Sequence, residues 1–416
     1  MSDVDSGPLR APKPKAGTCI KCKTRPSTVV LRHVQYCKDC FLFATTGKFR
    51  SAFGKSAISN TTGHKAMVAF SGGPSSRALL HLMKGFQHVG SHQSGQKRLF
   101  DELVICHIDE TAAFNGSSTL DMARVVVDTE YPDFTFHGQL IEDIYEDEAL
   151  SSIDKKEKLR QLFAQAGSLT AKEDLLWHIK MHLLVKAAQK LGCTRLILGD
   201  SATRIAIKVI SFTAKGRGYS LPLEIGGDIH GLYPNLVILR PLKDMLAKEI
   251  AIYDHSQGLL NSLVPATNFS TMAPPTASID RATEEFIVGL DRDFPSTVST
   301  IVRTASKLKL ASSMNGQSRC ALCHMPIQSG SKDWKQRITV QSTQCTRDSA
   351  PGTLTVPENI LCYACQTDLS ESEGWSRLAD DASPSTQLEE FRSLGYPTLL
   401  TQDDMHQRIK DFLLDD

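Results

Sequence analysis

The chain has 416 residues, of which 41% are hydrophobic and 22% are charged, and its formal net charge is +1. These values are typical of a folded globular protein with about two or three domains, and they argue against a disordered or fibrous chain. No apolar run approaches the roughly 20 residues of a membrane span, and charges and prolines stand where a signal peptide would be apolar. We therefore expect a cytoplasmic protein without a membrane partner.

Charge is distributed unevenly along the chain. Residues 1–55 contain 11 Lys and Arg against 3 acids, whereas residues 366–416 contain 12 acids against 4 Lys and Arg. The basic end predicts a surface for a polyanion, and the acidic end is typical of a solvated segment.

We expect five segments in chain order. Residues 1–17 are short, polar and proline-bearing, which predicts a disordered tail. The other segments are a first four-Cys module at 18–56, a main body at 57–310, a second four-Cys module at 311–370 and an acidic C-terminal segment at 371–416.

Eight of the 11 cysteines form four Cys-x-x-Cys pairs. The pairs are Cys19 and Cys22, Cys37 and Cys40, Cys320 and Cys323, and Cys362 and Cys365. In a cytosolic protein this spacing indicates metal rather than disulfide, and four thiolates leave no open position for water. We therefore expect two structural zinc sites, the first closed by a hairpin through a β-rich piece at 28–31. An iron–sulfur cluster accepts the same ligands and is the alternative.

The main body reads as strands alternating with helices. Apolar runs predict strands at 66–70, 103–108, 134–139 and 196–198, and helical patterns occupy 173–191 and the segment from about 279. Such alternation predicts an α/β fold with a parallel sheet and helices on both faces.

One strand runs straight into a glycine turn and then into an amphipathic helix. The residues of this turn are Ser71, Gly72, Gly73, Ser75 and Ser76. The glycines permit a sharp turn, and the hydroxyls and free N–H groups of the first helical turn would converge on a phosphate. The spacing is neither that of a Walker loop nor that of the dinucleotide fingerprint. An ordinary strand-to-helix turn with a Ser cap is the alternative.

Two basic segments are candidates for RNA phosphate contacts. They contain Lys48, Arg50 and Lys55 beside the first four-Cys module, and Lys208, Lys215 and Arg217 in a glycine-containing loop. Contacts of this kind give affinity without base specificity. A solvated surface is the alternative for the loop, and Phe49 and Phe53 are expected to pack rather than to stack on bases.

Several motifs together resemble one family. They are the glycine turn, the strand end Ile108-Asp109-Glu110, the segment GDSATRIAIKVISFTAKGRGYSLP from Gly199, the CIKCK and YCKDCF stretches, and the flanking four-Cys modules. Over nearly its full length the chain resembles the tRNA 2-thiolation branch of the PP-loop ATP pyrophosphatases. The resemblance implies a HUP-like sheet, with Asp109 and Asp200 joining the glycine turn in a nucleotide site.

The chain departs from the active members of that family at three places. Their motif is SGGxDS, and Ser75 stands at the Asp position; their Ala-Asp-Asp run is replaced by Ala202-Thr203-Arg204. Between Glu110 and Arg319 the chain has only Cys193, and a lone thiol cannot hold the iron–sulfur cluster of thiolating relatives. These losses count against ATP turnover, and we expect a degenerate nucleotide site with no catalytic residue and no iron–sulfur cluster.

The resemblance implies a function in tRNA 2-thiolation. In the family pathway, ATP adenylates the wobble uridine of tRNAs for Lys, Glu and Gln, and sulfur arrives as a thiocarboxylate on a ubiquitin-related modifier. We expect a noncatalytic, tRNA-binding subunit that forms a heterodimer with a catalytic paralogue in a sulfurtransferase complex. Two alternatives are open: a subunit that still adenylates uridine through its glycine turn, and a zinc-dependent protein interaction module without an RNA role.

Overall fold

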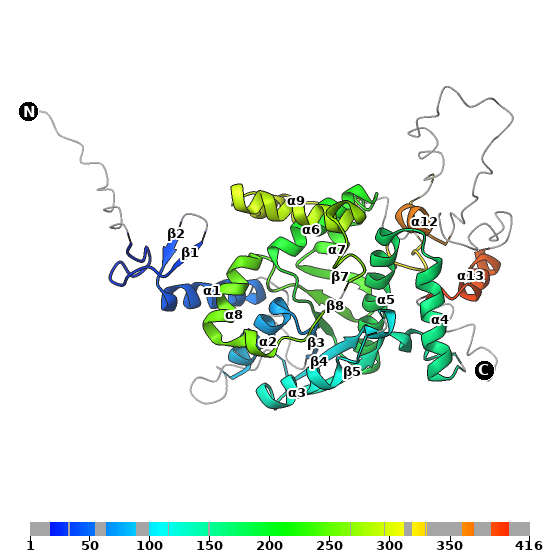
Figure 1. Cartoon of the computed structure of the whole chain (residues 1–416), viewed down its shortest axis with the longest axis horizontal. Helices are drawn as coiled ribbons and strands as arrows, with labels where there is room; N and C mark the ends of the chain where they lie inside the picture. The colour runs from blue at the N-terminus through cyan, green and yellow to red at the C-terminus, as the bar shows by residue number, and fades with distance from the viewer. Residues whose placement is uncertain are drawn as a thin grey trace, which may run out of the picture.

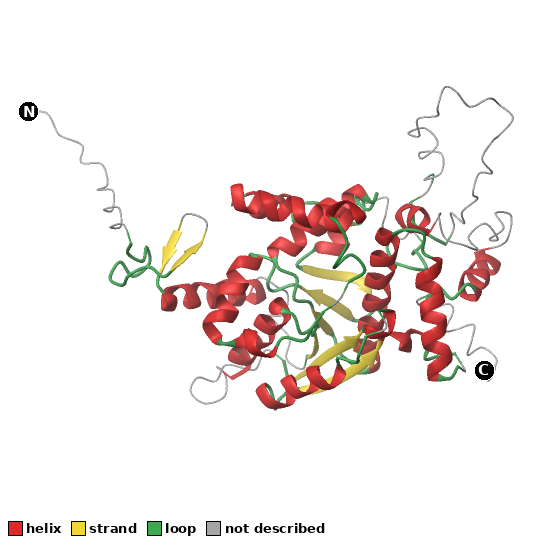
Figure 2. Cartoon of the chain, in the orientation of Figure 1, coloured by secondary structure: helices red, strands yellow, loops and turns green. Residues whose placement is uncertain are grey.

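A six-stranded sheet forms the centre of the chain (Figure 2). In spatial order its strands are β5 (Thr135–Leu140), β4 (Glu102–Asp109), β3 (Lys65–Ala69), β6 (Arg195–Ile197), β8 (Leu236–Leu239) and β7 (Asp228–Tyr233). The computed structural model describes residues 17–31, 34–54, 64–88, 100–114, 116–148, 150–266, 268–294, 296–311, 318–328, 330, 360–369 and 384–398.

The predicted parallel sheet is confirmed for five strands and corrected at one edge. Strands β5, β4, β3, β6 and β8 run parallel, whereas β7 pairs with β8 in antiparallel orientation. Neither β7 nor β8 was predicted from the sequence. They are joined at Pro234-Asn235, where Asn235 has a φ of 55°. A Pro-Asn pair between two apolar runs is a turn signal, so the sequence did carry this hairpin.

Helices cover both faces of the sheet, as predicted (Figure 1). One face carries α1 (Lys38–Gly54), α2 (Pro74–His88), α3 (Leu120–Glu130) and α8 (Ala247–Gln257), and the other carries α4 (Ser152–Gln165) and α5 (Leu169–Lys190). Strand side chains alternate between the two layers: Val68 packs with the α2 face and Met67 with the α5 face. The sheet is thus buried on both sides.

A third apolar cluster lies beyond β6. It joins α6 (Ala202–Ala214) to α7 (Leu221–Ile225), α9 (Ile279–Asp293) and α10 (Thr297–Ala305). The helix predicted from about 279 is α9, whose N-cap Ser278 accepts from the Arg281 N–H. Four short 3-10 helices complete the body: η2 (Thr111–Ala113), η3 (Ile141–Tyr145), η4 (Leu259–Ser262) and η5 (Pro275–Ala277).

The two cysteine regions pack differently. The first consists of the hairpin β1 (Val29–Leu31) and β2 (Val34–Tyr36) and the start of α1, which project from the body in Figure 1. The second, with α12 (Tyr363–Leu369), shares its apolar cluster with α5 and the sheet. None of the helices in the described part is both long and apolar enough to cross a membrane.

The chain ends lie largely outside the described residues. Of the predicted tail at 1–17, only Gly17 is described. Of the acidic segment at 371–416, residues 384–398 are described, and they contain α13 (Pro384–Ser393). Phe391 and Tyr396 are buried in the main core, and the Tyr145 hydroxyl donates to the Gly395 carbonyl at 2.8 Å. This part of the acidic segment is therefore folded against the body.

Buried polar groups lie behind α2. Arg77 is fully buried and donates to Glu130 at 2.6 Å and to Ser262 at 2.7 Å. Asp254 is also fully buried, and neither of its carboxyl oxygens has a hydrogen-bond partner among the described residues. Burial raises the pKa of Asp254 to about 7, against the opposing charge of Arg77. The folded chain thus holds this proton more tightly than the unfolded chain does.

That proton makes stability depend on pH. Because the folded-state pKa of Asp254 is raised, folding stability falls as the pH rises from about 4 to about 7. Asp254→Asn keeps a neutral side chain at every pH and is expected to raise the Tm by several degrees at pH 8 and by less at pH 5. Thermal melts at both pH values measure this, with exposed Asp244→Asn as the control. An equal gain at both pH values would contradict the prediction.

Candidate functional site

The glycine turn lies at the carboxyl end of β3, where ligands of parallel sheets bind. Gly72 has a φ of +78°, and a β-carbon on it would lie 2.2 Å from the Cβ of Val264. The Val264 N–H also donates to the Gly72 carbonyl at 3.1 Å. Gly73 is less crowded, since its nearest neighbour would be Ser71 Oγ at 3.7 Å. Gly72 therefore has a packing role that the sequence motif did not reveal.

The serines of the turn bond mainly to one another. Ser76 is buried and donates to the Gly73 carbonyl at 2.9 Å, and Ser71 Oγ donates to Ser76 Oγ at 3.3 Å. Ser75 is half-buried and Ser71 is exposed. Pro74 opens α2 and has no N–H to offer an anion. The structure thus brings the five predicted residues together, with the Ser71 hydroxyl bonded within the turn.

Asp109 is fully engaged by its own loop. Its carboxylate accepts from the Thr111 N–H at 2.9 Å, from the Thr119 N–H at 3.1 Å, and from the hydroxyls of Thr111 and Ser118. Burial opposes ionisation, but these donors outweigh it and lower the pKa of Asp109. The carboxylate organises the loop after β4.

Asp200 is engaged by two cations. Lys208 lies 3.0 Å and Arg240 2.9 Å from its carboxylate oxygens. Burial opposes ionisation, yet the two cations hold the pKa of Asp200 well below its usual range. Burial also lowers the pKa of Lys208 to about 8, with Asp200 opposing. Lys208 is thus a buried partner of Asp200 rather than a surface contact for phosphate, which corrects the sequence prediction.

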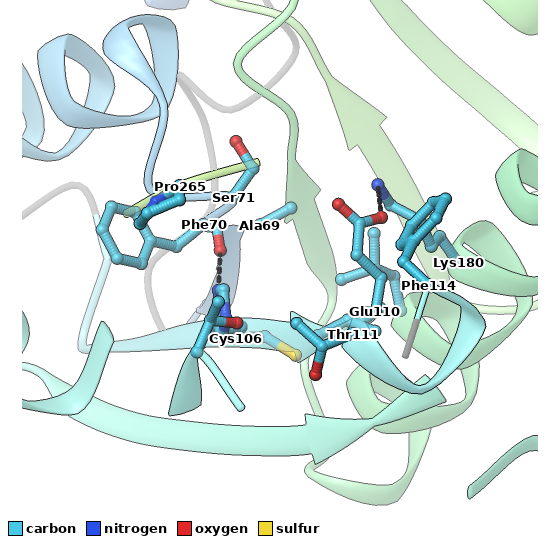
Figure 3. Close-up of a pocket in the computed structure, with 13 residues that line it drawn as sticks. Ala69, Phe70, Ser71, Cys106, Glu110, Thr111, Phe114, Lys180 and Pro265 are labelled. Carbon is cyan, nitrogen blue, oxygen red and sulfur yellow. Dashed lines mark hydrogen bonds and ion pairs between the residues drawn. The ribbon is translucent and has the colours of Figure 1, made fainter. Parts of the chain in front are cut away.

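A small cavity of ≈ 80 Å³ lies at the ends of β3 and β4 (Figure 3). Ser71 and Pro265 lie on one side of it, and Glu110 and Lys180 form a 2.6 Å ion pair on the other. Burial raises the pKa of Cys106 to about 12, so its thiol is unreactive at neutral pH. The cavity is far smaller than the roughly 300–1,000 Å³ of typical small-molecule sites.

The predicted flexible basic loop is wrong, because its cations are buried. Lys215 has 1% of its side chain exposed and contacts Asp174 at 2.8 Å and also Asp280. Gly216 has a φ of +77°, and a β-carbon there would lie 2.7 Å from the ring of Tyr363. The segment is therefore tightly packed against α12.

Arg217 is the centre of this buried network. It donates to His178 at 2.8 Å, to Asp368 at 3.1 Å and to Asp174 at 3.4 Å, and it lies 4.0 Å from Cys365 Sγ. Burial opposes the ionised form of Asp174, but Arg217 and Lys215 outweigh it and lower the pKa of Asp174 to about 2. The charge of Arg217 is thus paired inside the protein through Nη2, while its Nε and Nη1 are buried without a hydrogen-bond partner among the described residues.

Both predicted cysteine sets form clusters. In the set Cys19, Cys22, Cys37 and Cys40, and in the set Cys320, Cys323, Cys362 and Cys365, all four sulfurs lie within 4.8 Å of one another. Two of the sulfur–sulfur separations are 3.9 Å, between Cys22 and Cys37, and 3.5 Å, between Cys323 and Cys362. All four cysteines of the second set are buried, despite the 38 residues between its pairs. Each set could hold a metal ion.

The basic segment beside the first cluster is partly exposed. Lys48 pairs with Glu249 at 2.8 Å and keeps 40% of its side chain exposed, and Arg50 is exposed. Lys55 lies outside the described residues. Phe49 and Phe53 are buried, with their rings 4.9 Å apart, so the prediction that they pack is confirmed.

Comparison with known proteins gives one consistent family. Residues 278–367 match the family described as Cytoplasmic tRNA 2-thiolation protein 2. A protein of that name from Phaeosphaeria nodorum is 30% identical over 85% of this chain and 94% of its own length. The protein of that name from Schizosaccharomyces pombe is 28% identical to this chain, and the match covers 87% of this chain and 95% of that protein.

A solved structure supports the fold alone. The U34-tRNA thiolase NcsA from Methanococcus maripaludis, described with its 4Fe–4S cluster, has a TM-score of 0.51 and 18% identity. The match covers 73% of this chain and 93% of the thiolase. The predicted α/β class with a PP-loop-like sheet is thereby confirmed.

The packing of Gly72 can be tested by one methyl group. Gly72→Ala is expected to destabilise the fold by about 2–4 kcal/mol, because the residue must keep a positive φ and would clash with Val264. Gly73→Ala is the matched control and should cost less than about 1 kcal/mol. Chemical denaturation without added nucleotide measures both. Equal stability of the two variants would refute the packing role.

The two cysteine clusters are expected to differ in their effect on stability. Cys323→Ser removes a possible metal ligand from the main core and should lower the Tm of the whole body, because metal binding free energy is folding free energy. Cys22→Ser should lower the Tm of the body less, since its sulfurs are not part of that main core, although β1 and α1 pack on the α2 face of the sheet. Near-ultraviolet circular dichroism follows the melting of the body, and elemental analysis gives the metal content of each variant. Cys193→Ser, at a buried cysteine, is the control. Similar losses for Cys22→Ser and Cys323→Ser would contradict this.

Proposed function

Because this chain belongs to the cytoplasmic tRNA 2-thiolation protein 2 family, we propose that it is a noncatalytic, tRNA-binding subunit of the cytoplasmic complex that 2-thiolates the wobble uridine of tRNAs for Lys, Glu and Gln. A catalytic paralogue, tRNA 2-thiolation protein subunit one, completes the heterodimer. It carries out adenylation and sulfur transfer from the thiocarboxylate of the ubiquitin-related modifier.

One observation carries the noncatalytic assignment: the carboxylates expected at the nucleotide site have internal partners. Asp109 accepts four hydrogen bonds from its own loop, and Asp200 is neutralised by Lys208 and Arg240. A magnesium ion on ATP needs carboxylate oxygens that are free to coordinate it. Ser75 stands at the Asp position of the SGGxDS motif and offers only a hydroxyl.

The first four-Cys module supports the RNA-binding assignment. Lys21, Lys23, Lys38 and Arg50 are exposed there, and none of them forms an ion pair within the part of the chain that the structure describes. Unpaired cations on one projecting module give an RNA backbone a place to bind. Lys48 adds a cation that Glu249 holds in position.

We assign structural zinc to both cysteine clusters, within the modules at 18–56 and 311–370. Four sulfurs bound at about 2.3 Å to one zinc ion stand about 3.8 Å apart, close to the 3.9 Å and 3.5 Å separations in the two clusters. A closed tetrahedral site supplies folding energy and no open coordination position. A 4Fe–4S cluster would bind each thiolate to a different iron and place the cysteine sulfurs further apart.

The proposal is tested by reconstitution with tRNA. The purified chain should contain about two zinc atoms, bind tRNA, and yield 2-thiouridine in nucleoside mass spectrometry only with the catalytic paralogue, ATP and the modifier thiocarboxylate. Thiolation by this chain alone, or a chain that contains iron, would overturn it.

A second readout addresses the adenylation alternative. Pyrophosphate release by this chain alone, dependent on ATP and tRNA and abolished by Gly73→Val, would make it an enzyme. Gly73 is the suitable position because changes at Gly72 disturb packing. We expect no such release.

A further inference from the structure

A second cavity lies between three helices, away from the glycine turn. Its volume is ≈ 280 Å³, and it is lined by side chains of α1, α2 and α8. Figure 1 shows these three helices side by side on one face of the sheet, where α1 extends from the first four-Cys module. The cavity therefore lies at the junction of that module with the body, a common location for ligand sites.

Polar groups line this cavity on all three helices. His81 Nδ1 lies 2.7 Å from the Tyr253 hydroxyl, and Thr46 and Gln257 also line it. Burial, with Lys84 and Arg77 nearby, lowers the pKa of His81 and favours its neutral ring. Since Nδ1 is bonded to Tyr253, Nε2 is the ring nitrogen left for a ligand. Arg50 adds an exposed guanidinium with no ion pair within the described residues.

One of the residues that line the cavity is a glycine. Gly85 lies within α2 and lines the cavity, and a β-carbon on it would meet no described atom within 4 Å. Glycine within a helix costs about 1 kcal/mol relative to alanine. Since Gly85 is exposed and neither a positive φ nor a close neighbour requires glycine here, the position has room for a larger side chain.

We propose that this cavity binds one unpaired ribonucleotide of the bound tRNA. Arg50 contacts its phosphate, the His81 and Tyr253 pair hydrogen-bonds its base, and the apolar wall of Leu42 and Leu82 packs against the base. Unpaired bases are recognised through such hydrogen bonds and packing, whereas duplex RNA hides those edges. This inference rests on the proposed tRNA-binding function and names the part of the tRNA that the subunit holds.

Charge favours RNA over a protein segment as the occupant. The described part of the first module contains six Lys and Arg, namely Lys21, Lys23, Arg25, Lys38, Lys48 and Arg50, and one acid, Asp39. Asp39 is already paired with Arg25. A polyanion complements this surface, and its backbone can run along α1 to the cavity mouth at Arg50.

Filling the cavity is the direct test. Gly85→Leu places a side chain in the cavity without a backbone clash and replaces a poor helix former. We expect it to weaken binding of a tRNA transcript and of a short single-stranded oligouridine by at least about fivefold, the loss of one base contact. Its Tm should stay equal or rise, which separates blocking from unfolding.

Two matched variants control for the substitution itself. Gly85→Ala leaves most of the space, and Gly47→Leu makes the same change on α1, where the glycine likewise has no neighbour within 4 Å and does not line the cavity. Both should bind RNA within about twofold of the parent chain. A duplex RNA of the same length should bind the parent chain and Gly85→Leu equally.

Two further variants assign the roles of the polar groups. Tyr253→Phe removes only the hydroxyl and should weaken tRNA binding roughly three- to tenfold without changing its salt dependence. Arg50→Gln should instead reduce the slope of log affinity against log salt by about one. Lys38→Gln, an exposed cation outside the cavity lining, should reduce the slope without altering the single-strand preference.

The outcomes distinguish failure of the cavity assignment from failure of the proposed RNA-binding function. If the parent chain does not bind tRNA, the proposed RNA-binding function itself fails. If the parent chain binds and Gly85→Leu binds equally well, only the cavity assignment is overturned. If Gly85→Leu keeps its RNA affinity and loses its association with the catalytic paralogue, the cavity is a protein contact and the assignment is likewise overturned.

Discussion

The internal pairing of buried charges at the carboxyl edge of the sheet determines what this chain can do. Ionised side chains are costly to bury unless each one is paired and hydrogen-bonded. Here Asp200 is matched by Lys208 and Arg240, and Asp174 by Lys215 and Arg217. Charges that neutralise one another leave a weaker electrostatic field for magnesium, nucleotide phosphate or RNA. The same ion pairs that stabilise the body therefore support the proposal that this edge does not turn over ATP.

Arg217 connects this charge network to the second cysteine cluster. It lies 4.0 Å from Cys365 Sγ while it contacts Asp174 on α5. A divalent ion held by four thiolates keeps a net negative charge, and a buried guanidinium beside it compensates part of that charge. Because the cluster also shares its apolar core with α5 and the sheet, a metal ion bound there would stabilise the body as well. The first module is joined to the opposite face of the sheet instead, through Val29 of β1 and Phe49 of α1.

The sequence predicted what depends on short-range pattern and missed what depends on distant partners. Apolar runs located β3, β4, β5 and β6, and Cys-x-x-Cys spacing located both clusters. The sequence predicted Lys215 and Arg217 in a surface loop because their partners, Asp174 and Asp280, lie 41 to 65 residues away in the chain. The sequence indicated only a phosphate-binding turn at Gly72, because Val264, which packs on it, is still more distant in the chain. Hairpin β7–β8 differs from these cases, since its turn signal is local and the predicted strands did not include it.

The distribution of cations without an ion pair bears on which subunit of the proposed heterodimer holds the tRNA and which carries out the reaction. Within the described residues most cations at the PP-loop-like edge are paired, although the exposed Arg204 on α6 forms no ion pair there. By contrast, α1 and the turn before β1, with Lys21 and Lys23, present several cations that form no ion pair. RNA attracted by those cations would bind across α1, over the helical face of the sheet rather than at its carboxyl edge. Under the proposed function, the subunit would hold the tRNA through one module while the reacting base enters the active site of the partner, so that no uridine need reach this chain's own glycine turn.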